Sequence, residues 1–506
     1  MFSAFLEKYK DNILGVVSCF DRIIISGTMP GWRYPGAMKF FLLKHKIKFV
    51  DYTKFAKSVR DKINAQMETL SAKTRVPIVY IRSPRLVNKE NTVKKIISEK
   101  NLKQGIVAIF SIMESCDGYQ TTWNKITHTG DVRARSSKCL HYYLYFLDKY
   151  LGLCFIRIPT WLPCKVQLYF NGHNLLAYKL RKNRIMYILQ DNVFTYLSDF
   201  QKAQKLSDKI SAGNLHSGLK AFMRRYLPVF AEYRQWPEWT FTQAEYATDI
   251  VFKDKHRMKH LYDELILRCI HLVKPGNIAT FFNRSLAAHY EQEVTTHYNK
   301  MIHGTRVKHA IGANSVKMYD KAPGVLRIET TVNNIKAFRI YRMVKTRQGT
   351  ITWKKAEMKK SIYSIHPLRK ECTAVNSRYL DFLASFDDTS AGRMNLEQLS
   401  NPLKDNGRSV KGINFFDKQE QDVLIAVHCG SNTLNGIRNK TLRKNLGDNY
   451  SSAKVSRILT RLRKHNLIEK VPNTHCYHLT KLGLSTIPCG LYIRELELPA
   501  ILSKVA

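Results

Sequence analysis

Apolar positions change their spacing several times along the first part of the chain. Residues 16–28 and 105–113 are apolar runs rich in β-branched side chains, which predicts two buried strands. Between them, residues 52–72 have the apolar spacing of a long amphipathic helix. The other elements predicted here are a helix over residues 34–46, a strand over 47–50, a strand over 77–82 and a helix over 88–100.

Strands and helices that alternate in this way are typical of an α/β protein with a largely parallel sheet. A split α+β arrangement would give a similar pattern, so both remain open. A chain of 506 residues favours about three domains. We therefore expect a multidomain α/β (α+β) protein that begins with an α/β sheet domain over residues 1–135.

An aromatic pattern begins near residue 139. Residues 139–147 and 153–161 flank a short polar segment, which predicts a β-hairpin, and residues 165–170 predict a third strand that ends at Asn171-Gly172. Aromatic strands of such a β-meander can stack on bases, although alternate side chains also simply fill a core. The aromatic residues are Tyr142, Tyr143, Tyr145, Phe146, Phe155, Trp161, Tyr169 and Phe170.

The middle of the chain is mainly helical before it returns to strands. Residues 172–300 have helical spacing, and residues 301–343 have β spacing with a turn at Pro323-Gly324. With the meander and a helix over 371–385, these make a central α+β domain over residues 136–385. Residues 386–412 are polar and rich in Gly, Ser and Asn, which is typical of a linker.

The last part of the chain predicts three helices and a two-stranded hairpin. A first helix covers residues 417–428, a second lies within 433–447, and a third begins after Ser451 or Ser452 as N-cap. This order is typical of a winged helix-turn-helix, whose third helix enters the major groove of duplex DNA. Such a domain can also contact protein or RNA. We place it at residues 413–490, followed by a tail over 491–506.

Basic side chains are concentrated on that domain. Residues 430–470 contain ten Lys or Arg and two acids. On the third helix, the apolar face of Val455, Ile458, Leu459 and Leu462 leaves the basic residues on another face. The residues expected to contact nucleic acid are Lys454, Arg457, Arg461, Lys464, Arg438 and Arg443 here, and Arg306, Lys308, Lys317, Lys321 and Arg327 upstream.

The charge of the whole chain supports this expectation. Eighty-two Lys and Arg stand against 40 Asp and Glu, a net charge of +42, while 44% hydrophobic residues are enough for folded cores. Such an excess repels itself unless a polyanion is bound, and nucleic acid is the leading candidate. An anionic membrane surface is disfavoured because the charge is spread along the chain rather than gathered beside an amphipathic helix.

The compartment follows from what the sequence lacks. The ten cysteines are scattered without a CxxC pair, so we expect reduced thiols and no disulfide partners. The sequence has no apolar run of membrane-spanning length, and the acidic residues near its start do not suit a signal peptide. We expect a cytoplasmic protein associated with the nucleoid or with RNA.

Acids are scarce, so their groupings are informative. Phosphodiester chemistry commonly uses two or three carboxylates that hold Mg²⁺, although isolated acids are more often ion-pair partners. Glu245 and Asp249 would share a face of a helix, since they are four residues apart. The four groupings are Asp21 in the first strand, Glu114 with Asp117, Glu245 with Asp249, and Asp320 with Glu329.

Tyrosine and histidine offer further chemistry. Strand alternation puts Tyr319 on one side with Lys317 and Lys321, and nearby cations would favour attack by its phenolate on a phosphodiester; packing is the alternative. Tyr246, beside Glu245, is a second candidate nucleophile. His141 and His173 could act as acids or bases or bind phosphate, or be structural. The sequence has no Walker loop and no Rossmann fingerprint, which disfavours an ATPase or a dehydrogenase.

With these residues in hand, the chain resembles a widespread bacterial family of unassigned function. Its members are often labelled only as hypothetical or winged-helix proteins, and their scattered, multicopy occurrence suggests mobile elements. The resemblance implies no mechanism. It lies in SCFDRIIISGTMPG, GIVAIFSIMESC, CLHYYLYFLDKYLGLCFIRIPTW, LYFNGHN, QAEYATDIVF, KMYDK…LRIETTVN and the C-terminal segment.

A local resemblance covers residues 317–330. KMYDK followed by LRIET is similar to paired strands of plasmid and phage replication initiators, which hold a metal-bound nicking site with a tyrosine nucleophile. This implies Tyr319 as nucleophile. The chain lacks the histidine pair of such sites, so the resemblance implies a carboxylate site for Mg²⁺ at Glu245, Asp249 and Glu329.

Three functions fit these patterns. The first is a DNA-processing enzyme of a mobile element, a metal-dependent nickase, replication initiator or recombinase. The second is a non-catalytic protein that forms a ribonucleoprotein with a large structured non-coding RNA, which would use more of the charge than a short DNA site. A transcriptional regulator ranks last, because it would not need the upstream domains.

Overall fold

The structure is a computed structural model. It describes residues 3–83, 87–126, 129–286, 293–300, 304–346, 349–385, 396, 398–405, 407–428, 436–447, 450–472 and 474–497. The chain forms two compact units, one of Met1–Val16, Thr248–Thr330 and Glu371–Ala506, the other of Val17–Ala247 and Thr331–Lys370.

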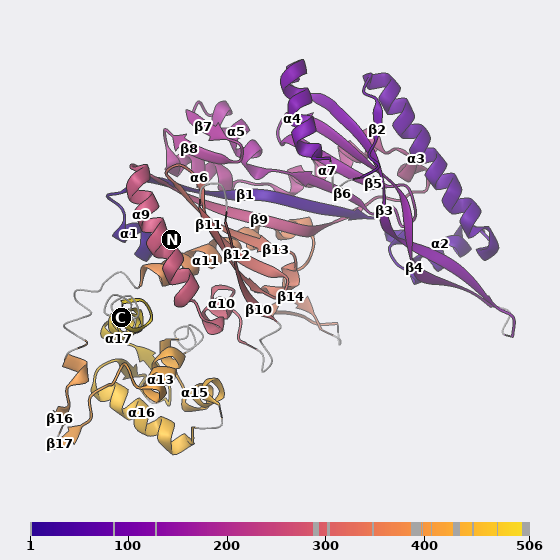
Figure 1. Ribbon diagram of the computed structural model, residues 1–506. Helices are drawn as coiled ribbons and strands as arrows, with labels where there is room; N and C mark the ends of the chain where they lie inside the picture. Colours follow the sequence, from indigo (N-terminus) through magenta and orange to yellow (C-terminus); the bar gives the residue numbers. More distant parts are fainter. Residues whose placement is uncertain are drawn as a thin grey trace. The chain divides into compact units, whose positions relative to one another are not determined.

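A mixed sheet of eleven strands dominates the fold (Figure 1). Its strands lie in the order β10-β11-β12-β13-β9-β1-β6-β5-β4-β3-β2. They are β1 (Ile13–Thr28), β2 (Ile78–Tyr80), β3 (Gly105–Asn124), β4 (Thr129–Asp148), β5 (Gly152–Pro159), β6 (Val166–Phe170), β9 (Glu238–Phe252), β10 (Val294–Lys300), β11 (Thr305–Ile311), β12 (Asn314–Ala322) and β13 (Val325–Val332).

The other strands pair as four separate hairpins. These are β7 (Tyr187–Gln190) with β8 (Val193–Leu197), β14 (Arg339–Lys345) with β15 (Ile351–Glu357), β16 (Leu403–Asp405) with β17 (Arg408–Val410), and β18 (Ile468–Lys470) with β19 (Tyr477–Leu479).

Helices connect these strands. The longer ones are α2 (Pro35–Lys44), α3 (Tyr52–Thr74), α4 (Lys89–Lys100), α5 (Gly172–Lys182), α6 (Phe200–Asp208), α7 (Ala212–Tyr226), α9 (Lys255–His271), α11 (Ile365–Ala384), α13 (Lys418–His428), α15 (Asn439–Leu446), α16 (Ser452–Lys464) and α17 (Lys481–Tyr492). The short ones are α1 (Ser3–Lys8), α8 (Val229–Glu232) and α10 (Pro275–Phe281).

The expectation of a largely parallel sheet is wrong. β2 and β3 are parallel, but β3–β4, β4–β5, β5–β6 and β1–β6 are antiparallel pairs. The reason lies in the connections: helix α4 joins β2 to β3 as a crossover, whereas β4 and β5 are joined by the tight hairpin that the meander predicted. The domain boundary expected at residue 135 falls within β4.

Two local predictions are also wrong. Residues 47–50 form no strand; Phe49–Asp51 is a short 3-10 turn before α3. The segment that contains Glu245 and Asp249 is not a helix but the strand β9. Its sequence, EWTFTQAEYATDIVF, is rich in aromatic and β-branched residues, which favour a pleated strand once neighbours cover it.

The C-terminal elements fall where the sequence predicted them. Ser451 caps α16, accepting a hydrogen bond from the Lys454 amide, and α15 ends at Gly447 with φ of +77°. Val455, Leu459 and Leu462 bury the apolar face of α16. The hairpin β18–β19 follows. Part of the expected linker is ordered into β16–β17, and Leu399 and Ile413 join the core of this region.

Among the described helices, none is long and apolar enough to cross a membrane. The nine cysteines that the structure describes are free thiols, and eight of them are buried.

The turn into helix α5 fixes a close approach to β1. Asn171 caps α5 by accepting from the His173 amide. A Cβ on Gly172 would lie 2.2 Å from the carbonyl oxygen of Phe20, closer than any real contact. Glycine at this position therefore allows the start of α5 to lie against the strand.

Gly172→Ala should lower the free energy of unfolding by about 1–3 kcal/mol, because backbone must move to admit the methyl group. Thermal unfolding followed by circular dichroism measures this. Gly218→Ala is the control: Gly218 lies in α7 with nothing within 4 Å of a new Cβ, so alanine should leave stability unchanged or raise it by up to about 1 kcal/mol. Equal effects of the two substitutions would contradict this account of Gly172.

Candidate metal centre

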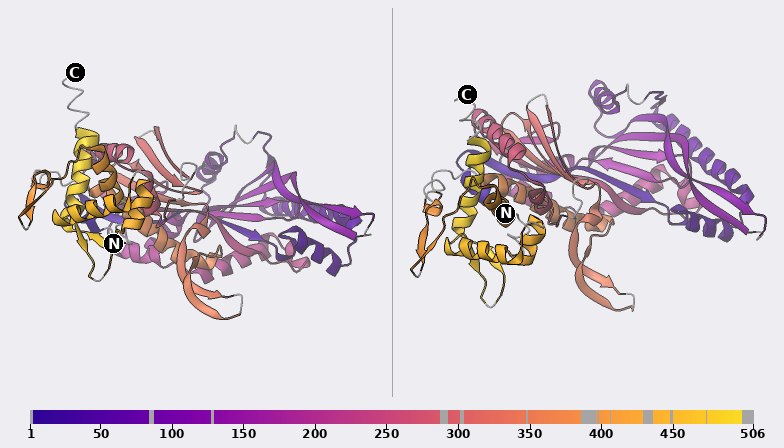
Figure 2. Two further views of the ribbon diagram at one scale, coloured as in Figure 1. Left: turned by 90° about the horizontal axis from the view of Figure 1, so that it is seen from below. Right: turned by 60° about the horizontal axis from the view of Figure 1, so that its bottom comes forward.

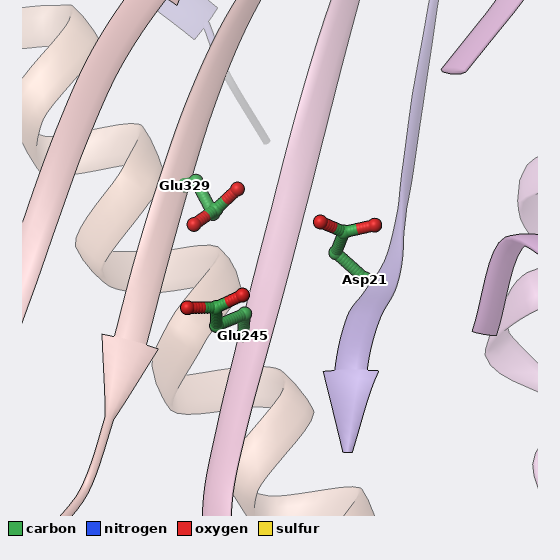
Figure 3. A group of neighbouring side chains, drawn as sticks. All are labelled: Asp21, Glu245 and Glu329. Atoms are coloured by element: carbon green, nitrogen blue, oxygen red, sulfur yellow. The ribbon is translucent and has the colours of Figure 1, made fainter. Parts of the chain in front are cut away.

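Three carboxylates from neighbouring strands point toward one another (Figure 3). Asp21 lies on β1, Glu245 on β9 and Glu329 on β13, and these strands are consecutive in the sheet. One oxygen of each lies within 4.8 Å of the others. This carboxylate triad is the group in the described part of the chain that could hold a metal ion.

Polar groups around the start of α5 hold Asp21. Its Oδ1 accepts from Asn171 Nδ2 at 3.1 Å and lies 3.1 Å from His173 Nδ1. Asn192, in the turn between β7 and β8, donates to both carboxylate oxygens at 2.7 and 2.8 Å. The motif Asn171-Gly172-His173 therefore serves both the helix start and Asp21, which fixes the orientation of that carboxylate.

Glu329 is held from strand β12. Lys317 Nζ lies 2.7 Å from Oε1, and the Tyr319 hydroxyl donates to Oε2 at 2.7 Å. The predicted strand alternation, with Lys317 and Tyr319 on one side, is thus confirmed. Both contacts reach a side chain that is 3% exposed, so they stabilise a carboxylate that has lost most of its water.

Glu245 lies nearest to solvent. Arg22 Nε is 3.6 Å from its Oε2, and the Thr331 hydroxyl lies 3.5 Å from Oε1. The Glu245 side chain is 13% exposed and that of Arg22 is 42% exposed. A ligand would therefore reach the triad most directly past Glu245 and Arg22.

The donor set of the triad suits a hard cation. Carboxylate oxygens are the ligands that Mg²⁺ and Mn²⁺ prefer, and three like charges so close together repel one another in a buried setting. A divalent cation would relieve that repulsion. The surrounding amides and cations orient the acids in the way that outer ligands do in metal sites.

Asp249 takes a different role from the predicted one. Arg327 donates to both of its oxygens, Nε to Oδ1 at 2.5 Å and Nη2 to Oδ2 at 2.7 Å, and both side chains are at most 1% exposed. Asp249 therefore forms a buried bidentate ion pair and lies outside the triad. For the same reason, Arg327 is not placed to contact nucleic acid.

The two candidate nucleophiles are buried. Tyr319 is 8% exposed, with its hydroxyl on Glu329. Tyr246 is 1% exposed and its ring packs edge-on against Phe20, with centroids 5.1 Å apart. A nucleophile must reach a phosphorus atom, and burial makes positioning the role that fits Tyr319 better.

Glu114 belongs to a separate ion pair. Arg157 Nη2 lies 2.8 Å from its Oε2, and the Tyr143 hydroxyl donates to its Oε1 at 2.9 Å. Burial raises the pKa of Glu114, but these hydrogen bonds outweigh it and hold the pKa below its usual value. His141 is buried and faces the Cys139 carbonyl oxygen at 3.0 Å, lining a polar cavity of about 280 Å³.

The basic residues of α16 differ in availability. Arg457 is exposed, whereas Arg461 forms an ion pair with Glu420 at 3.0 Å and Lys464 one with Asp405 at 2.8 Å. Lys454 Nζ lies 4.6 Å from the centroid of the Tyr450 ring. Of the other candidates, Arg438 and Arg443 are exposed, and Arg306, Lys308, Lys317 and Lys321 are half-buried.

Sequence reasoning missed three residues. Asp21 is among the acidic groupings that the sequence shows but not among the expected ligands, although an acid within an apolar strand is itself a signal. Asn192, which holds Asp21, gave no signal. Arg463 is exposed on α16 and is not among the residues that the sequence pattern singles out.

Comparisons with protein-family models, with curated proteins and with solved structures gave no match.

Glu245→Gln should weaken Mn²⁺ binding by at least about 10-fold, since even loss of an outer partner costs that much in metal sites. Calorimetric titration measures the affinity, and the rise in unfolding temperature with added Mn²⁺ gives a second readout. Glu238→Gln is the control, because Glu238 lies on the same strand with a 58% exposed side chain. Equal binding by both variants would remove the triad as a metal site.

Proposed function

We propose that this protein is a metal-dependent nucleic-acid processing enzyme that cuts or joins DNA strands, as a nickase, replication initiator or recombinase of a bacterial mobile element. The carboxylate triad is the observation on which the proposal depends. Sheets that hold two or three acids around Mg²⁺ suit phosphodiester chemistry, and the charge of +42 favours a polyanionic substrate. The resemblance to a family with mobile-element-like occurrence supports the biological setting.

Each residue of the site has a task in this proposal. Asp21, Glu245 and Glu329 supply oxygen ligands. A divalent cation held by these three acids would supply Lewis-acid chemistry toward a phosphodiester. Lys317, 2.7 Å from Glu329, would add positive charge beside the site, where negative charge develops on phosphate oxygens. Arg22, at the solvent edge, would meet an incoming phosphate first.

The nucleophile in this proposal is water or a hydroxyl group of the nucleic acid, because the Tyr319 hydroxyl is buried. In this proposal Tyr319 orients Glu329 through its hydroxyl and forms no bond to DNA. The nicking sites of replication initiators would instead give a covalent tyrosine link, so the two mechanisms are distinguishable.

The C-terminal region supports duplex binding. Three helices followed by a hairpin, with cations on the exposed side of α16, fit a winged helix whose third helix enters the major groove. Arg457 and Arg463 are the exposed arginines of that helix, whereas Arg461 is occupied by Glu420.

A second candidate is a non-catalytic protein that binds a large structured non-coding RNA. The size and spread of the charge favour it, since one short DNA site needs far fewer cations. Purification from the host without nuclease, followed by sequencing of bound nucleic acid, separates the two: a discrete RNA with no cleavage activity supports this candidate.

Glu329→Gln should reduce Mg²⁺-dependent cleavage of DNA by about 100-fold or more, because it removes the charge of a ligand and one of the two oxygens that accept from Lys317 and Tyr319. Gel assays on single-stranded and duplex substrates measure the rate, with Glu238→Gln as the control. Tyr319→Phe should retain part of the activity. The wild-type protein should form no covalent adduct with DNA. A DNA-linked Tyr319 would overturn the assignment of its role, and wild-type protein without any cleavage would overturn the enzyme proposal.

Arg457→Ala and Arg463→Ala should each weaken duplex binding and reduce the slope of log affinity against log salt by about 1, the loss of one phosphate contact. Arg461→Ala removes the same charge from the same helix but should leave the slope nearly unchanged, since Arg461 already pairs with Glu420. Fluorescence anisotropy over a salt series measures this. Identical slopes for all three variants and the wild type would exclude α16 as the contact helix.

A further inference from the structure

Strands β14 and β15 form a two-stranded arm outside the large sheet (Figure 2). Their register pairs Arg339 with Glu357 and Lys345 with Ile351, so the antiparallel ladder is regular over its whole length. An isolated hairpin of this kind is only marginally stable by itself, because it has no second layer to bury its side chains.

One face of the arm carries four large apolar side chains that are exposed in the part of the chain that the structure describes. Met343 pairs with Trp353, while Tyr341 and Ile351 lie two positions away on the same face. Their exposed fractions are 64% for Tyr341, 55% for Met343, 64% for Ile351 and 65% for Trp353. Apolar side chains gathered at such exposure on a folded protein typically mark a binding surface.

Cations border that face. Lys355 is the cross-strand partner of Tyr341, and Lys345 is that of Ile351. Arg339 lies at the base of the same face, opposite the arm's one acid, Glu357. The other face places Arg342 opposite Lys354. The arm thus has aromatic rings on one face and positive charge on both faces.

This combination selects the chemistry of a partner. A purely apolar protein surface would leave the cations without partners, and duplex DNA offers phosphates but keeps its base faces stacked. Unpaired nucleotides offer both a negative backbone and free base faces, and aromatic rings beside Lys or Arg bind them by stacking.

We propose that the β14–β15 arm is a binding surface for single-stranded nucleic acid, with Trp353 and Tyr341 as stacking platforms and Lys345 and Lys355 as phosphate contacts. The arm carries no residue of the carboxylate triad or of α16. It would hold a strand that is displaced or unpaired while other parts of the protein act on it.

The inference takes its ligand class from the proposed function, but its test does not depend on catalysis. Binding is measured with EDTA present, so the binding test gives a result even if the protein has no nuclease activity. Conversely, cleavage can be intact in a variant that has lost the arm surface.

The first experiment compares tryptophan variants in binding of a fluorescent oligothymidylate or oligouridylate by full-length protein. Trp353→Ala should weaken binding by about 10-fold, within the range for loss of one stacked base, and Trp353→Phe should retain most of it. Trp123→Ala is the control, since Trp123 is similarly exposed at 58% but lies on β3. Equal losses in Trp353→Ala and Trp123→Ala would overturn the proposal.

The second experiment tests which face of the arm binds the single strand. Lys355→Ala and Lys354→Ala remove the same charge from adjacent positions of one strand, but only Lys355 shares the face of Trp353. Lys355→Ala should weaken single-strand binding several-fold more than Lys354→Ala. Equal effects, or losses seen only with duplex, would show a general electrostatic contribution and overturn the assignment.

Unchanged oligonucleotide binding in the double variant Tyr341→Ala, Trp353→Ala would also overturn it. If the wild-type protein self-associated in sedimentation and the double variant did not, the arm would be a protein contact instead. Circular dichroism and thermal unfolding of each variant establish that the rest of the fold is intact.

Discussion

Repulsion among buried carboxylates is the constraint on the centre of the large sheet. Asp21, Glu245 and Glu329 come within 4.8 Å of one another from three consecutive strands. Like charges at that separation repel one another, and nearby donors and cations offset the repulsion. The partners come from separate elements: Asn171 and His173 at the start of α5, Lys317 and Tyr319 on β12, and Arg22 on β1. The local structure of each element therefore serves the same electrostatic requirement.

Asp249 meets the same problem with a different solution. A single arginine satisfies both of its oxygens, which leaves the pair closed and buried. The triad acids are instead held mainly by several separate groups, and Glu245 keeps an edge toward solvent. The contrast separates a carboxylate closed in a buried ion pair from carboxylates that could hold a metal ion, although all four are acids in strands of one sheet.

The sequence predicted what local patterns determine. Helices α3, α4 and α16 and the β4–β5 hairpin follow from periodicity, capping and turn residues within a few positions. The same reasoning failed for β9, whose spacing suits a helix as well as a strand until its neighbours are known. Scarcity of acids singled out Glu245 and Glu329. The partnership of Asp249 with Arg327 could not be foreseen, because 78 residues separate them and strand pairing across the sheet decides it.

The strand character of β9 has a consequence for how this chain can vary. Glu245 and Asp249 stand four residues apart, an even number, so the pleat turns both to one side of the sheet. A single-residue insertion or deletion between them would turn one acid to the opposite side of the sheet. Either Glu245 would leave the triad or Asp249 would leave its ion pair with Arg327. This stretch can therefore tolerate changes of side chain more readily than changes of length, unlike the loops that join the surrounding strands.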